Sequence, residues 1–179
     1  MTQSQHLQRC LSLFDQQIEG IKENLLDLDR EVLLAKPAVG DWTIAQIAEH
    51  LRISGQSYEV PLSLYFKTAP RREGDPDFKE TWLGAQILKR AGPGGKAPVP
   101  KMYEPSKVSD PDAIRKLLEE LQRLRDIAAE GRNKDLGKIA ISSPMLSLLR
   151  FSAGDVLIIN AMHGQRHLGQ IYSLLNAGS

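Results

Sequence analysis

Apolar residues recur at steps of three and four along much of the chain, which is the period of amphipathic α-helices. The first such stripe predicts a long helix over about residues 3–34. Its apolar face consists of Leu7, Leu11, Phe14, Ile18, Ile21, Leu25, Leu28 and Val32. Cys10 lies beside this stripe and is expected to be a small core residue rather than a nucleophile.

A second helix is predicted over about residues 43–67. Pro37 and Gly40 end the first helix, and Thr43 and Gln46 have the spacing of a capping box that starts the next one. The apolar series then continues towards Tyr65. We expect Pro61 to kink or end this helix, because proline lacks the backbone N–H that a helix interior needs.

Residues 70–111 have a different pattern, with seven of the ten prolines of the chain. The segment "FKETWLGAQILKR" predicts one short helix, and the remainder is a long loop, most clearly in the Pro/Gly-rich stretch 92–107. Loops of this length are uncommon in compact domains unless they are functional or disordered. Two interpretations stay open at this point: a surface connection, or a wall over a pocket.

Two further long helices are predicted, over about residues 110–130 and 152–176. Asp110 is a candidate N-cap for the first and Gly131 its end; Ser152 and Asp155 suit the first turn of the second, and Gly178 its end. A short helix is also expected near "SPMLSLLR".

Four amphipathic helices with a long connection between the second and third predict an all-α protein, a four-helix bundle with a crossover. Its 179 residues fit a single domain, 1–179, that can bury a core without disulfides. The residues expected to be buried in that core are Leu11, Phe14, Ile18, Leu51, Leu121, Val156 and Leu174.

Charge and composition narrow the function. Twenty-three Lys and Arg balance 22 Asp and Glu, so no general attraction for nucleic acid or an acidic membrane surface is expected. No window approaches the roughly 18 apolar residues of a membrane span. The single cysteine and the absence of a signal-like start lead us to expect a cytoplasmic protein.

The candidate chemistry lies in the histidines. His163 and His167 are one helical turn apart, on the mostly apolar face that also carries Ile159, Gln170 and Leu174. The nearby Gly164 and Gly169 would let a neighbouring helix or a ligand approach closely.

Two interpretations of this histidine pair are open. A lone inward histidine usually has only a structural hydrogen bond, whereas paired histidines on facing helices can hold a metal ion. His50, three residues after Ile47 on the second helix, supplies a third imidazole near the core, and three imidazoles with an open fourth position are typical of catalytic metal sites. His6 lies at the start of the first helix, where we expect fraying and no role.

The segments "DWTIAQIAEHL" and "HGQRHLGQI" together resemble the DinB/YfiT-like superfamily. The residues that match its pattern are Trp42, Thr43, His50, His163, Arg166, His167 and Gln170. The resemblance implies an up-down-down-up four-helix bundle, often a homodimer, with a divalent metal ion held by His50, His163 and His167. The metal is expected to be zinc or nickel, with iron or manganese as alternatives.

Two functions follow from this resemblance. The first is a metal-dependent enzyme that activates water or a small thiol, hence a hydrolase or a thiol S-transferase acting on a small molecule. No protein nucleophile is evident, and Glu49 and Glu59 are candidate general bases only by their proximity in sequence. The second is a non-catalytic, stress-related bundle that binds a metal or a small molecule. A closed coordination sphere would favour the second, and an open one beneath a pocket the first.

Overall fold

The structure, a computed structural model, describes residues 1–37, 42–96 and 98–177. It is predominantly helical, as predicted. The elements in chain order are α1 (Gln3–Asn24), α2 (Arg30–Leu34), α3 (Ile44–Thr68), α4 (Trp82–Ala91), a 3-10 helix η1 (Lys101–Tyr103), α5 (Ala113–Glu130), β1 (Ile139–Ser142), β2 (Arg150–Ser152) and α6 (Ala153–Ala177).

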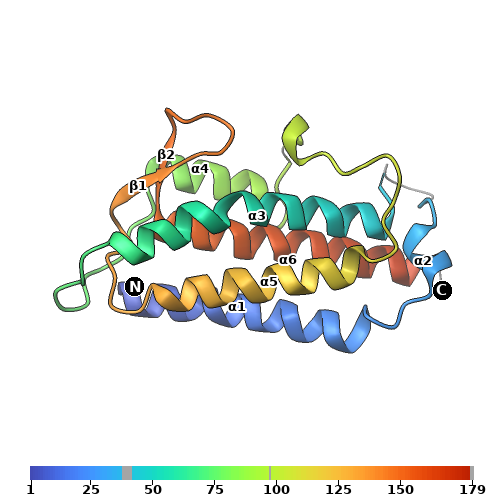
Figure 1. Cartoon of the computed structure of the whole chain (residues 1–179), viewed down its shortest axis with the longest axis horizontal. Coiled ribbons are helices and arrows are strands. Elements are labelled where there is room, and N and C mark those ends of the chain that lie inside the picture. The colour runs from blue at the N-terminus through green and yellow to red at the C-terminus, as the bar shows by residue number, and fades with distance from the viewer. Residues whose placement is uncertain (38–41, 97, 178–179) are drawn as a thin grey trace.

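The four long helices α1, α3, α5 and α6 lie side by side (Figure 1). Helices α1 and α3 each pack against both α5 and α6, so α1 and α3 lie across the core from each other. In Figure 1, α1 and α6 run in one direction and α3 and α5 in the other. The shorter α4 packs against α6.

The core between these helices is apolar. Six of the seven residues predicted to be buried are buried: Leu11, Phe14, Ile18, Leu51, Leu121 and Val156. Leu174 is half-buried, because it lies in the last turns of α6, where fewer residues cover it. Cys10 is fully buried, as expected of a core residue.

Side-chain caps fix where α3 and α6 begin. Thr43 and Gln46 form the predicted capping box, with bonds of 3.2 and 3.1 Å between side chain and backbone. Ser152 and Asp155 form the reciprocal pair at α6, at 3.0 and 3.1 Å. The buried Asp155 carboxylate also accepts a 2.7 Å bond from the Thr81 hydroxyl, which ties the start of α4 to the start of α6.

The predicted helix over 3–34 is wrong in its second half. Helix α1 ends at Asn24, and the short α2 starts again at Arg30. Asp27 and Asp29 lie in the interruption, where aspartate side chains favour turns over helix interiors. Val32, expected on the buried stripe, is 40% exposed.

The start of α5 also differs from the prediction. Helix α5 begins at Ala113, with Asp112 rather than Asp110 as its N-cap residue. The Asp110 carboxylate accepts a 2.9 Å bond from the Asp112 backbone N–H, so it stabilises the turn before the helix.

Pro61 does not end α3, which continues to Thr68. Gly40 and Gly178, predicted as helix ends, lie outside the described residues.

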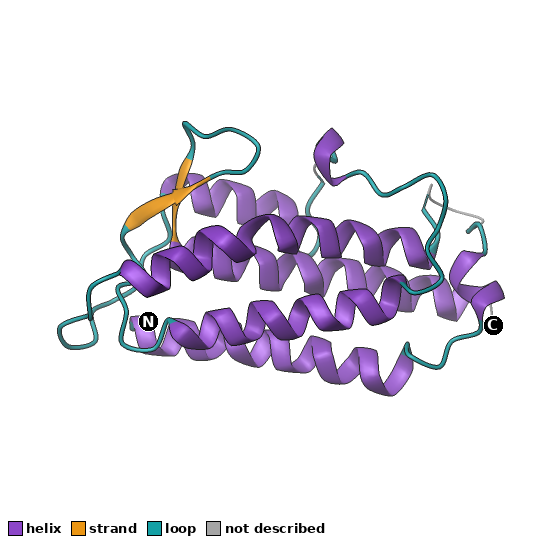
Figure 2. Ribbon diagram, in the orientation of Figure 1, coloured by secondary structure: helices purple, strands orange, loops and turns teal. Residues whose placement is uncertain are grey.

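A β-hairpin replaces the short helix predicted near "SPMLSLLR" (Figure 2). Strands β1 and β2 pair antiparallel, and the Ser143 backbone N–H donates a 2.8 Å bond to the Leu149 carbonyl. Ile141 and Phe151 are buried, whereas Leu148 at the loop is 88% exposed. Met145, Leu146 and Leu148, which suggested a short helix, therefore lie in the loop of the hairpin and are exposed.

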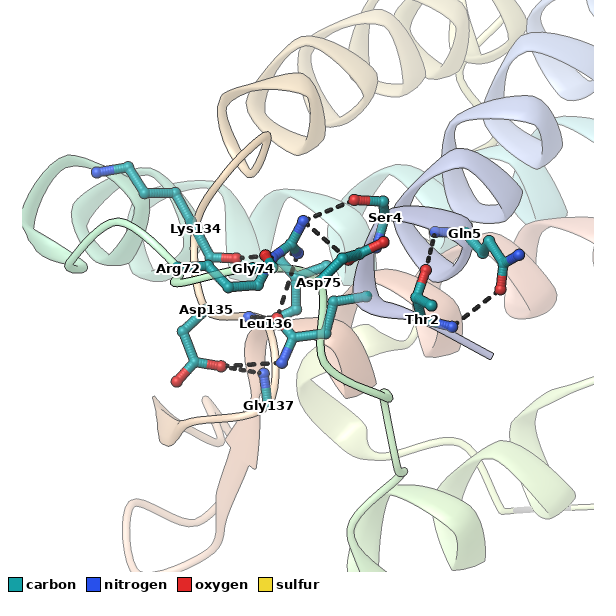
Figure 3. Close-up of polar contacts among 11 residues, drawn as sticks. Thr2, Ser4, Gln5, Arg72, Gly74, Asp75, Lys134, Asp135, Leu136 and Gly137 are labelled. Atoms are coloured by element: carbon teal, nitrogen blue, oxygen red, sulfur yellow. Dashed lines mark hydrogen bonds and ion pairs between the residues drawn. The ribbon is translucent and has the colours of Figure 1, made fainter.

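Polar contacts around Arg72 fasten the start of α1 to two connections (Figure 3). The Arg72 guanidinium donates to the Ser4 hydroxyl at 2.6 Å and lies 3.1 Å from the Asp75 carboxylate. The buried Gln3 side-chain oxygen accepts a 2.8 Å bond from the Leu136 backbone N–H. The N-terminal end of α1 is therefore held in place by residues that follow α3 and α5.

None of the described helices has a stretch that is both long and apolar enough to span a membrane.

Candidate metal centre

Two neighbouring helices bring three histidines together. His50 lies in the second turn of α3, and His163 and His167 lie one turn apart on α6. Each ring offers one nitrogen to the cluster, and these three atoms all lie within 4.8 Å of one another. The predicted convergence of the three side chains is thus present in the structure.

The spacing of His50 and His163 suits two ligands of a tetrahedral ion. The His50 and His163 Nε2 atoms are 3.3 Å apart. Two nitrogens bound at about 2.0–2.1 Å to a tetrahedral ion lie about 3.3–3.4 Å from each other. The ring of His167 packs edge-on against both other imidazoles, with centroid distances of 4.9 and 4.6 Å.

Hydrogen bonds outside the cluster set the tautomers of two rings. His50 Nδ1 lies 2.8 Å from the Tyr103 carbonyl, and His167 Nδ1 lies 3.0 Å from Gln170 Oε1. Both partner oxygens are acceptors, so in the neutral rings each Nδ1 carries the proton and each Nε2 keeps its lone pair. In metal sites, a hydrogen bond from the ring nitrogen that does not bind the metal typically orients the imidazole in this way.

Burial keeps the three rings neutral. Desolvation lowers the pKa of His163 to about 2, with further contributions from His167, His50 and Arg166. Desolvation, followed by the charge of Arg166, lowers the pKa of His167 to about 3, and burial also lowers the pKa of His50. Neutral imidazole is the form that binds metal ions.

Arg166 is the cation nearest to the cluster. Its Nη2 lies 2.6 Å from His167 Nε2, and its Nη1 donates a 3.1 Å bond to the Gly95 carbonyl. Its Nε is buried and has no hydrogen-bond partner among the described residues. Arg166 Nη2 thus contacts the lone pair of His167 Nε2, which is the lone pair that would bind a metal ion.

A model of the DinB superfamily matches residues 13–171 of the chain. The chain belongs to the DinB superfamily. No curated protein and no solved structure matched it. The match spans both segments that carry the resemblance, so the three histidines lie within the superfamily region.

A cavity of about 260 Å³ opens beside the cluster of this DinB-superfamily chain. His50 and His163 line it, together with residues of α4, α6 and the stretch 98–103. Pro98, Val99 and Pro100 form one side of the cavity. Of the two interpretations of the 92–107 stretch, the wall over a pocket is therefore the one that fits.

Glu49 and Glu59, considered as general bases, do not line this cavity. Glu49 accepts a 3.0 Å bond from the Ser106 backbone N–H, and Glu59 pairs with Arg123 at 2.9 Å. Both carboxylates therefore have structural partners. Cys10 lies in the core on α1, where burial raises the pKa of its thiol to about 12.

His6 was expected to be frayed, and this expectation is wrong. Its side chain is 2% exposed, its Nε2 lies 3.0 Å from the Gly154 carbonyl, and its ring stacks on Phe78 at 3.7 Å. Its position four residues before Cys10, on the buried side of α1, was the signal for this. It is a buried structural histidine, separate from the cluster on α3 and α6.

Sequence reasoning also missed Tyr103 and Arg90. Tyr103 holds His50 through its backbone carbonyl, which any residue could supply, so its side chain gave no signal. Arg90 lines the cavity from the last turn of α4. It appeared in the sequence only as part of an ordinary basic pair with Lys89.

Proposed function

We propose that His50, His163 and His167 bind one divalent metal ion, and that the chain is a metal-dependent enzyme of the DinB superfamily. The observation that carries this proposal is the convergence of three neutral imidazoles beside a cavity. Among the described residues, no fourth histidine, cysteine, aspartate or glutamate joins the cluster. This supports a coordination position left open for a small molecule.

The chemistry proposed is activation of water or of a low-molecular-weight thiol, in a hydrolase or a thiol S-transferase. A divalent ion in such a site lowers the pKa of bound water towards about 7 and deprotonates a coordinating thiol. Tyr103 and Gln170 would hold two of the rings with Nε2 directed inward. The donor set suits zinc or nickel, and also iron or manganese.

Several finer features belong to the same proposal. The four long helices would form the up-down-down-up bundle of the superfamily, as one domain over residues 1–179. We also propose a cytoplasmic homodimer that acts on a small molecule and does not bind nucleic acid. Light scattering at micromolar concentration tests the dimer, and a monomer mass would contradict it.

The experiment that tests the enzyme proposal starts with metal analysis of protein purified without an affinity tag. Thiol-transfer and ester-hydrolysis screens then follow, with His167→Ala compared against Gln165→Ala, which changes an exposed residue of the same helix. We expect one ion per chain, and activity that is lost on chelation and in His167→Ala alone. One ion per chain without any turnover in these screens would favour the non-catalytic, metal-binding alternative.

A further inference from the structure

Among the described residues, those that line the cavity beside the histidine cluster carry positive charge and no negative charge. Arg90 and Arg166 both line it, and no aspartate or glutamate is among its lining residues. Neither arginine forms an ion pair within the part of the chain that the structure describes. Arginines that face a cavity without a carboxylate partner leave donors free for an anionic ligand.

The two arginines come from different elements. Arg166, on α6, is fixed by its contacts with Gly95 and His167, and its buried Nε has no hydrogen-bond partner within residues 1–37, 42–96 and 98–177. A buried guanidinium N–H without a partner is unfavourable unless something else accepts its bond. Arg90, on α4, is exposed, and its side chain forms no hydrogen bond with another described residue.

The rest of the cavity wall is largely apolar. Its apolar residues include Ile87, Pro98, Val99, Met145 and Ile159. Apolar walls with a few polar groups that fix orientation are typical of small-molecule sites. The body of a ligand in this cavity would therefore be apolar, and its charged group would lie near the arginines.

We propose that this cavity binds a small molecule with an apolar body and one anionic head group, a carboxylate or a phosphate ester, and that Arg90 and Arg166 recognise that head group. The guanidinium group matches both anions, because its N–H donors can form paired bonds to two oxygens. The inference rests on the proposed function, since it names the chemical class of the molecule that would reach the histidine cluster.

The test uses protein freed of metal by a chelator, so that an anion cannot bind through an ion. Isothermal titration would compare 4-phenylbutyrate with its neutral analogue 4-phenylbutyramide, and phenyl phosphate would serve as the second anion. The variants are Arg90→Gln and Arg166→Gln. The matched control is Arg132→Gln, an exposed arginine that does not line the cavity. Circular dichroism checks that each variant is folded.

We expect at least one of the two anions to bind about tenfold or more tightly than the amide, and its affinity to fall about tenfold in Arg90→Gln and in Arg166→Gln but not in Arg132→Gln. Whichever anion binds more tightly identifies the head group. Equal affinity for anions and amide, or unchanged anion binding in Arg90→Gln, would overturn the proposal. Because the Arg90 side chain forms no hydrogen bond or ion pair with the described part of the chain, its variant stays informative even if Arg166→Gln fails to fold. Metal analysis is separate, so anion binding without metal binding would contradict only the proposed metal site.

Discussion

Gln170 is the residue that most directly controls one of the candidate ligands. Its side-chain oxygen lies 3.0 Å from His167 Nδ1 and fixes the tautomer in which Nε2 is unprotonated. Substitution of a residue that orients a metal ligand through such a hydrogen bond typically lowers metal affinity about 10–100-fold. We expect Gln170→Ala to weaken zinc binding by that factor in a competition titration with a chromophoric chelator, and Gln165→Ala to leave it unchanged. Equal affinities in the two variants would show that Gln170 does not position His167.

The buried carboxyl group of Glu120 should make the stability of the protein depend on pH, independently of the histidines. It is fully buried, one of its oxygens has no hydrogen-bond partner among the described residues, and burial raises its pKa to about 7. The unfolded chain has the ordinary value of 4.5, so the folded state binds more protons between these two values. The protein should therefore lose stability as the pH rises from 4.5 towards 7 through this group.

Glu120→Gln keeps the shape of the side chain and removes its charge. We expect the free energy of unfolding at pH 8 to rise by about 1–3 kcal/mol, and the gain to shrink as the pH approaches 4.5. Urea unfolding at several pH values measures this, with the exposed Glu119→Gln as the control. The other Glu120 oxygen, Oε2, accepts a 3.0 Å bond from Arg123 Nη2. A loss of stability at pH 8 would mean that this ion pair outweighs the burial of the charge.

The sequence predicted the positions of the three clustered histidines but not that of His6. The spacing of His163 and His167 placed both on one face of a helix, and the position of His50 after Ile47 placed a third imidazole near the core. The resemblance to the DinB superfamily then grouped the three as ligands. His6 was misjudged because helix ends usually fray, whereas Gly154 and Phe78, far away in sequence, cover this one. The spacing of His6 from Cys10 indicated the buried side of α1, but it could not show which distant residues cover the ring.

At the scale of elements, two glycines of α6 have opposite surroundings. A Cβ atom at Gly164 would lie 2.2 Å from Gln17 Oε1, whose side chain donates a 2.7 Å bond to the Ala161 carbonyl. A Cβ atom at Gly169 would meet nothing within 4 Å. The close approach expected at both positions therefore occurs only at Gly164, where α1 packs against α6.

We expect Gly164→Ala to lower the free energy of unfolding by about 1–3 kcal/mol, because Gln17 must move and lose its bond. Gly169→Ala should raise it by about 0.5–1 kcal/mol, because alanine favours the helix. Chemical unfolding of the two variants measures both effects. Equal effects would contradict the packing of α1 on α6 described for Gln17 and Gly164.

The elements that were predicted well have capping residues and an unbroken apolar period. The start of α3 at Thr43 and that of α6 near Ser152 followed from local bonds alone. The hairpin of β1 and β2 did not, because its four- and three-residue strands are too short for a clear alternation and its apolar loop resembled a helix. The hairpin also contacts α3, α4 and α6, which lie far from it or on either side of it in the sequence.

At the scale of the whole molecule, the long connection between α3 and α5 links the fold to the site. The stretch 98–103 covers the cavity and supplies the Tyr103 carbonyl that holds His50. The sequence indicated that this connection was irregular, but it could not show which face of the helices the connection would cover. That choice depends on packing between segments far apart in the chain.

We propose that His50, His163 and His167 share one metal ion with an open coordination position. X-ray absorption spectroscopy of protein loaded with one equivalent of zinc would identify the atoms bound to that ion. We predict three imidazole nitrogens at about 2.0–2.1 Å, one or more additional light atoms, and no sulfur. The spectrum of His167→Ala should show fewer imidazoles, and that of His6→Ala, which removes a histidine outside the cluster, should be unchanged. A sulfur ligand, or the same imidazole count in His167→Ala as in the unaltered protein, would show that the three histidines do not form this metal site.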